Sequence, residues 1–209
     1  MDEIEKKDRE EEVWNKDLIT AIEKEIASEF PSAKVFKGKV LKDIFLYKDE
    51  KLGYQLQFGF VDQDIVIYDE TMDISDFKAV KNIFLHNNKD NHKQLIIPKI
   101  ICELKFDGIT SHGLIIYSNY AADIKSIFPE CKYFLAMRHR KGSTANKLFR
   151  HGKFFDKTIF FDDGKSKARY EAGQFLNELT SDIELKSRFD EFITEIKFIL
   201  RSKKTHFVK

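Results

Sequence analysis

Residues 98–105 read PKIICELK, an apolar run that ends in a carboxylate and an amine. A buried strand usually ends in turn residues, whereas this run ends in Glu103 and Lys105, one residue apart. Because successive side chains of a strand point to opposite faces, Ile101, Glu103 and Lys105 share one face. Residues 95–105 therefore predict a buried strand that brings an acid and an amine together where the sheet opens to solvent.

A second acidic strand lies upstream, in the run VDQDIVIYD at residues 61–69. Asp64 stands at the head of its apolar part and shares a strand face with Asp62. If the two strands are neighbours, Asp64 and Glu103 converge. Asp62 and Asp69 belong to the same stretch and remain alternatives to Asp64.

Two carboxylates a few Å apart repel each other unless a cation lies between them. An all-oxygen site suits Mg²⁺, which takes few protein carboxylates and keeps several waters. The backbone carbonyl of Leu104 is a candidate third ligand. Lys105 is placed to orient or help deprotonate an attacking water, or to stabilise charge on a phosphate. Glu25 lies on the apolar face of the first helix, where its position fits a carboxylate at the rim of the core.

The rest of the chain alternates between helical and extended patterns. Apolar residues recur at helical spacing in 10–30, and extended runs follow in 35–69, with Gly53 at a turn. Residues 70–94 are mostly polar: NNKDNHK at 87–93 predicts a loop, and a short helix is a candidate near 75–85. Beyond 105 we expect a helix over 110–127 capped by Thr110 or Ser111, strands over 131–138 and 157–161, and helices near 166–179 and 182–202. This order predicts an α/β (α+β) layer structure, a central mixed β-sheet flanked by helices.

Composition agrees with one globular domain. The chain has 209 residues, of which 42% are hydrophobic and 34% charged. Cys102 and Cys131 lie in apolar runs and are expected to be reduced core residues, and no Cys/His spacing indicates zinc. The charged first residues contain no apolar segment and no run is long enough for a membrane span, so we expect a cytoplasmic protein.

Charge is distributed unevenly. Residues 1–30 hold eleven acidic and five basic side chains, a net charge of −6, whereas residues 138–157 hold seven basic and one acidic, a net charge of +6. A basic loop of this composition is either a solvated surface or a surface that contacts phosphates. The candidate DNA-binding residues are Arg138, Arg140, Lys141, Lys147, Arg150 and Lys153.

Asp64 in DQDIVIY, with Glu103 and Lys105 in IICELK, resembles the signature of the PD-(D/E)xK nuclease superfamily. The helix and buried strand expected after Lys105 match that family too, although Gln63 stands where the family often has Pro. The resemblance covers roughly residues 10–138 and implies a restriction-endonuclease-like core, αβββαβ. Residues 139–209 would add the basic loop and a helical C-terminal extension to a single domain, 1–209.

The resemblance implies a Mg²⁺-dependent endonuclease that cleaves double-stranded DNA, most plainly a type II restriction endonuclease. The resemblance implies that Asp64, Glu103 and Lys105 are catalytic. It also implies Asp64, Glu103 and the Leu104 carbonyl as metal ligands, with a helix-borne Glu25 as a further candidate ligand. Cutting both strands implies a homodimer, and a DNA methyltransferase would be encoded nearby. The alternatives are a nuclease of the same fold in repair, junction resolution or phage defence, and a non-catalytic nucleic-acid-binding module.

Overall fold

The central sheet carries the candidate site residues. The computed structural model describes residues 3–51, 53–73, 80–81, 86–87, 93–106, 108–138, 144–161 and 170–202. The strands of the sheet lie in the order β1 (Lys34–Asp49), β2 (Gly53–Tyr68), β7 (Ile100–Lys105), β8 (Lys132–Met137) and β9 (Lys157–Phe160), and β4 (Val80–Lys81) pairs with β2. β1, β2 and β7 are antiparallel, and β7, β8 and β9 are parallel. The predicted mixed sheet is confirmed.

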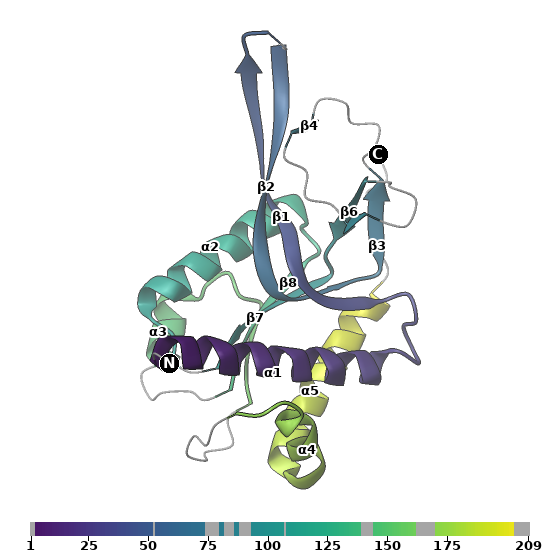
Figure 1. Ribbon diagram of the computed structural model, residues 1–209, viewed down its shortest axis with the longest axis vertical. Helices are drawn as coiled ribbons and strands as arrows, with labels where there is room; N and C mark the ends of the chain where they lie inside the picture. The colour runs from purple at the N-terminus through teal and green to yellow at the C-terminus, as the bar shows by residue number, and fades with distance from the viewer. Residues whose placement is uncertain are drawn as a thin grey trace.

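Helices cover both faces of this sheet (Figure 1). They are α1 (Glu3–Ile26), α2 (Ser111–Ile127), α3 (Thr144–His151), α4 (Gln174–Ser181) and α5 (Ile183–Arg201). Apart from four short strands that come between β2 and β7 along the chain, the described elements follow the predicted αβββαβ order as α1, β1, β2, β7, α2 and β8. Among the described residues, no helix is long and apolar enough to cross a membrane.

Strand alternation divides the core into two layers at β7. Ile100, Cys102 and Leu104 belong to the larger cluster, to which α1 contributes Trp14, α4 contributes Phe175 and α5 contributes Phe189 and Phe192. Ile101 faces the other way, into the cluster that α2 covers. Cys102 and Cys131 are both free and buried, as predicted.

The helix caps and turns of the structure largely agree with those expected from the sequence. The Thr110 side chain accepts a hydrogen bond from the Gly113 amide at 3.0 Å and caps α2, as predicted. Gly53 has a φ of 75°, which confirms the turn between β1 and β2. Asp182 caps α5 by accepting bonds from the amides of Glu184 and Leu185.

The single strand predicted over 95–105 is wrong. It is broken at Pro98, because proline has no amide hydrogen to donate to a ladder. The segment before it, β6 (Lys93–Ile97), belongs to a separate three-stranded sheet with β3 (Glu70–Asp73) and β5 (His86–Asn87). The ends of the loop predicted for 87–93 lie in β5 and β6, and residues 88–92 lie outside the described residues. The short helix predicted near 75–85 falls mostly outside the described residues.

The basic segment was predicted as a loop, but residues 144–151 form α3. The segment that begins at β9 was predicted to be part of a C-terminal extension, but it packs into the core. β9 pairs with β8, and α4 and α5 contribute Phe175, Phe189 and Phe192 to the same cluster as Trp14. Of the helix predicted near 166–179, residues 166–169 lie outside the described residues, and α4 begins at Gln174.

Arg138, predicted as a DNA contact, lies inside the protein. It follows β8 and is 1% exposed. Its guanidinium donates hydrogen bonds to the Phe161 carbonyl and the Glu178 carboxylate, and its centre lies 5.6 Å from the Phe175 ring centroid. Arg138 therefore ties the ends of β8 and β9 to α4, and we exclude it from the candidate phosphate contacts.

We expect Arg138→Ala to lower the free energy of unfolding by about 3–5 kcal/mol, because it leaves the Glu178 carboxylate and the Phe161 carbonyl without their partner. Urea unfolding followed by circular dichroism measures the change. Lys153→Ala, which removes an exposed charge, is the matched control and should leave the midpoint unchanged. An unchanged midpoint in Arg138→Ala would contradict this structural role.

Candidate active site

Asp64 is held at the junction of β2, β7 and α1. The two strands are neighbours, as predicted, with Ile65 opposite Cys102. The Asp64 carboxylate accepts a hydrogen bond from the Leu104 amide at 2.9 Å, and its backbone carbonyl accepts one from the Asn15 side chain at 2.9 Å. Both the side chain and the backbone of Asp64 are thereby fixed against the end of β7.

Glu103 and Lys105 form an ion pair at that end. Lys105 Nζ lies 3.0 Å from Glu103 Oε1. Glu103 is only 4% exposed, although it carries a carboxyl group. The strand alternation predicted from ELK therefore places both groups on one face, next to the strand that carries Asp64.

A second carboxylate reaches Lys105 from α1. Glu11 Oε1 lies 3.1 Å from Lys105 Nζ, and Glu11 Oε2 accepts a hydrogen bond from the Phe106 amide at 3.0 Å. The helix-borne carboxylate at this site is thus Glu11. Glu25 lies fourteen residues further along α1, about 21 Å away at 1.5 Å per residue.

Sequence reasoning missed Glu11, although a signal for it exists. Glu11 precedes the buried Trp14 by three residues and Leu18 by seven, so it shares their helix face. Glu25 lies on the same helix face, about four turns further along α1. Helical spacing alone does not say which end of α1 meets the strand ends.

An aromatic ring and a further amine complete the surroundings. Lys105 Nζ lies 4.8 Å from the centroid of the Tyr117 ring on α2, within cation–π range. Lys37 Nζ lies 3.9 Å from Asp64 Oδ1, next to a register shift in β1 between Phe36 and Gly38. Lys105 is thus enclosed by two carboxylates and a ring face, which fixes the position of its amine.

Burial dominates the electrostatics of the two strand carboxylates. It raises the pKa of Asp64 and raises the pKa of Glu103 to about 8, with the Lys105 charge offsetting part of each rise. Burial lowers the pKa of Lys105, but the charges of Glu103, Glu11 and Asp64 outweigh it, so the net shift is upward. Lys105 therefore stays cationic, while Glu103 ionises only with difficulty in the protein alone.

In the metal-free protein, the raised pKa of Glu103 predicts a stability that falls with rising pH. The folded state holds the proton more tightly than the unfolded state, so the stabilisation is complete below about pH 4.5 and is lost as the pH rises through about 8. Glu103→Gln cannot ionise and should lose most of this dependence. Unfolding free energies in a chelator from pH 5 to 9 measure the difference.

We expect the wild type and Glu103→Gln to differ little at pH 5 and the variant to be more stable at pH 9. Glu195→Gln, which changes a partly exposed carboxylate on α5, is the matched control and should keep the wild-type slope. Equal slopes in the wild type and Glu103→Gln would contradict the buried environment assigned to Glu103.

The donor set fits a hard divalent cation with few protein ligands. Asp64 and Glu103 supply oxygens from neighbouring strands, and burial raises the pKa of both although Lys105 lies beside them. Within the described parts of the chain, no group of three or more His, Cys, Asp or Glu side chains is arranged to hold a metal. Mg²⁺, which keeps several waters and takes one or two carboxylates, needs no such group.

The remaining predicted residues are spread over the surface. Asp62 is exposed, and Asp69 pairs with Lys99 at 3.9 Å, so neither approaches β7 as Asp64 does. Lys147 on α3 donates a hydrogen bond to the Ile109 carbonyl at 3.2 Å, shortly after the end of β7. The exposed basic residues beside it are Arg150 and Lys153. Arg140 and Lys141 lie outside the described residues.

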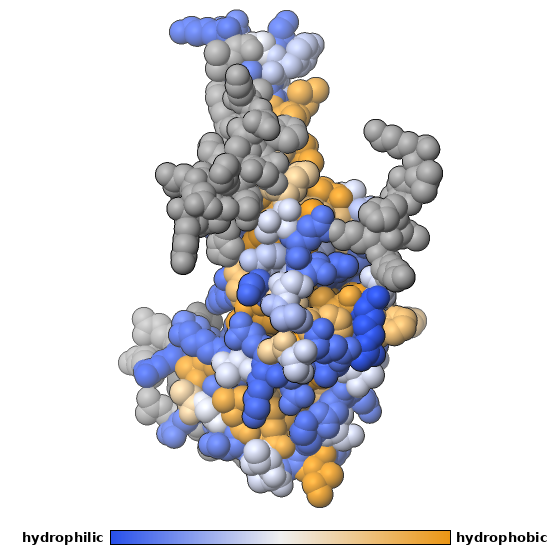
Figure 2. Space-filling model, turned by 90° about the vertical axis from the view of Figure 1, so that its right-hand side faces the viewer, coloured by the Kyte–Doolittle hydropathy of each residue, from blue (hydrophilic) through white to orange (hydrophobic). Residues whose placement is uncertain are grey.

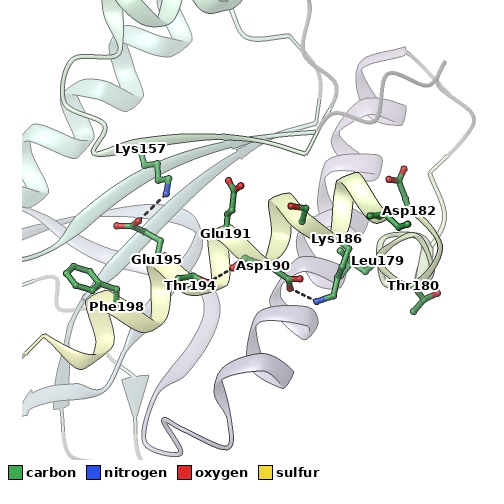
Figure 3. Close-up of a pocket in the computed structure, with 12 residues that line it drawn as sticks. Lys157, Leu179, Thr180, Asp182, Lys186, Asp190, Glu191, Thr194, Glu195 and Phe198 are labelled. Carbon is green, nitrogen blue, oxygen red and sulfur yellow. Dashed lines mark hydrogen bonds and ion pairs between the residues drawn. The ribbon is translucent and has the colours of Figure 1, made fainter.

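A separate hollow of about 770 Å³ lies along α5 (Figure 3). Acidic side chains dominate its polar lining: Asp182, Asp190, Glu191 and Glu195, against Lys157 and Lys186. Both lysines are neutralised, Lys157 by Glu195 at 3.1 Å and Lys186 by Asp190. An acidic hollow repels a polyanion, so this surface is not a candidate nucleic-acid site.

Comparisons with known proteins do not show a family or a function for this chain. No family model matches the sequence. No curated protein matches it either. One solved structure, described as the native BbvCI A2B2 tetramer at low resolution, superposes with a TM-score of 0.46 at 15% identity, covering 82% of this chain. The chain spans 61% of that chain, less than two thirds of its length.

Proposed function

We propose that this protein is a Mg²⁺-dependent endonuclease that hydrolyses phosphodiester bonds of double-stranded DNA, and specifically a site-specific enzyme of the type II restriction class. The observation that supports this most strongly is the hydrogen bond between the Asp64 carboxylate and the Leu104 amide. It joins the acidic strand to the strand that ends in Glu103 and Lys105. Two carboxylates and an amine then converge at one end of two adjacent strands.

Asp64 and Glu103 would hold the metal, with the Leu104 carbonyl as a third protein ligand. The bound ion would supply electrostatic stabilisation of a phosphate oxygen and lower the pKa of a water. Lys105 would orient the attacking water or stabilise negative charge on the phosphate. Glu11 and Tyr117 would hold the Lys105 amine in position from either side.

A nuclease that cuts both strands of a duplex needs two such sites, so the proposal includes a homodimer. Discrete fragments from a long duplex distinguish a site-specific enzyme from a repair, junction-resolving or defence nuclease of the same fold. Binding without any cleavage would identify a nucleic-acid-binding module.

We expect Asp64→Asn and Glu103→Gln each to slow Mg²⁺-dependent cleavage of a duplex by about a hundredfold to a thousandfold or more, because each removes charge that the proposed metal requires. Duplex binding, measured with Ca²⁺ in place of Mg²⁺, should change little. Gel analysis of cleavage rates and fluorescence anisotropy of a labelled duplex make the two measurements.

Asp62→Asn is the matched control for both variants, since Asp62 is an exposed carboxylate two residues from Asp64. It should cleave at the wild-type rate. Full activity in Asp64→Asn or Glu103→Gln, or equal losses in Asp62→Asn, would remove the basis for the assignment.

The basic face around α3 is the proposed path of the DNA backbone. Replacing Lys147, Arg150 and Lys153 by alanine should weaken the binding of all duplexes alike. It should also lower the slope of log affinity against log salt by about 1 for each side chain that neutralises a phosphate. Anisotropy titrations from 50 to 300 mM salt would measure this slope.

A control of equal charge loss replaces Lys157, Lys186 and Lys197, which are paired with Glu195, Asp190 and Glu29 near or on α5. We expect its salt slope to match the wild type. If both triple variants keep the wild-type slope, α3 does not contact phosphates and the DNA path lies elsewhere.

A further inference from the structure

Among the residues that the structure describes, seven large apolar side chains are at least half exposed, and they lie in three places. Four lie on the distal part of the β1–β2 hairpin, where Figure 2 shows apolar surface beneath a hydrophilic tip. Two, Ile183 and Phe198, lie on α5, and the last is Phe149 on α3, which is 92% exposed. The four on the hairpin are Ile44, Phe45, Leu46 and Tyr54.

The charge around these side chains differs between the three places. Residues 42–57 of the hairpin hold three basic and three acidic side chains, so their net charge is zero. The surface beside α5 is the acidic hollow. Residues 144–155, which contain α3, hold three basic residues, a histidine and no acidic residue. Phe149 is therefore the exposed apolar side chain whose surroundings favour a polyanion.

The packing of α3 does not account for Phe149. The helix is held to the body through Leu148, which packs against a buried cluster that includes Leu114 and Met137. Phe149 follows Leu148 by one residue, about 100° further around the helix, and leaves 92% of its surface in water. The ring therefore contributes almost nothing to the burial of apolar surface that stabilises the fold.

α3 is fixed next to the candidate active site. Lys147 donates a hydrogen bond to the Ile109 carbonyl, which is 3.2 Å away and follows Lys105 by four residues. Tyr117, whose ring lies against the Lys105 amine, packs on the same buried cluster as Leu148. A duplex bound at the candidate site would therefore lie beside α3.

The side chains around Phe149 suit a phosphate backbone on both sides of an apolar ring. Asn146 lies three residues before it on the helix, Arg150 follows it directly, and Lys153 lies four residues after it in the turn that ends α3. All three are exposed. Their amide, guanidinium and ammonium groups can donate hydrogen bonds to phosphate oxygens. Proteins that kink a duplex insert an apolar side chain between base steps from such a setting.

We propose that Phe149 is a DNA wedge: its ring enters a groove of the bound duplex and inserts between adjacent base pairs, which partly unstack, while Arg150 and Lys153 neutralise nearby phosphates. This inference rests on the proposed function, because it requires a duplex on this face. It adds an apolar contact to the bases themselves. Such a contact favours pyrimidine–purine steps, because these steps unstack most easily.

Unstacking of the DNA is the direct test. Wild-type protein, added in Ca²⁺ to short duplexes that carry 2-aminopurine at a pyrimidine–purine step, should raise the fluorescence of that base, because stacking quenches it. Phe149→Ala at saturating concentration should bind without this rise. Phe149→Leu, which keeps an apolar wedge, should retain part of it.

The affinity of Phe149→Ala separates a base contact from a phosphate contact. We expect this variant to bind duplexes about fivefold to a hundredfold more weakly than the wild type, the range typical of an aromatic ring that contacts bases. Its slope of log affinity against log salt should stay at the wild-type value, because phenylalanine neutralises no phosphate. Anisotropy titrations in Ca²⁺ at several salt concentrations measure both quantities.

Phe198→Ala is the matched control, because it removes a phenylalanine ring that is 66% exposed beside the acidic hollow on α5. It should bind duplexes with the wild-type affinity and give the wild-type rise in fluorescence. Thermal unfolding checks that Phe149→Ala and Phe198→Ala are both folded.

Two results would overturn the wedge and leave the proposed cleavage intact. One is a wild type that binds and cleaves duplexes without any rise in fluorescence, and the other is a Phe149→Ala variant that keeps both the rise and the affinity. A lower mass of Phe149→Ala in sedimentation, with unchanged duplex affinity, would overturn it in favour of a protein contact. A wild type that binds no duplex would remove the wedge and the proposed function together.

Discussion

A buried ion pair, Glu103 with Lys105, constrains the rest of the structure. A carboxylate that is 4% exposed is unfavourable, and the charge of Lys105, 3.0 Å away, offsets only part of the cost of burial, so the pKa of Glu103 stays raised. Keeping that amine in place requires Glu11 on α1 and the ring of Tyr117 on α2. Helices on opposite faces of the sheet are thereby tied to two residues at the end of one strand.

The backbone around the pair shows how local irregularities position functional groups. The register shift in β1 near Gly38 lies beside Lys37, which approaches the Asp64 carboxylate. Bulges of this kind redirect side chains without ending a strand. Pro98 acts differently, because it ends β6 and so separates a peripheral sheet from β7. A regular ladder through both positions would not bring the same groups to one place.

Most of the architecture was readable from apolar periodicity and a few capping residues. Alternation in IICELK correctly assigned Ile101 to one core layer and Leu104 to the other. Long-range partners were not readable in this way. Nothing local distinguishes Glu11 from Glu25 on the same helix face, or indicates that Arg138 turns inward to Glu178, forty residues further along the chain. Such contacts depend on where elements meet, which a single sequence encodes only indirectly.

The position of Arg138 has a consequence for the smallest part of this chain that can keep its core intact. β9 lies outside the αβββαβ element order, yet it forms the sheet edge next to β8, and Phe161 beyond it packs among Trp14, Phe175 and Phe192. A protein shortened after β8 would expose these rings and leave a guanidinium without its acceptors. Transplanting the candidate site into a smaller scaffold would therefore require the C-terminal third of the chain to be included.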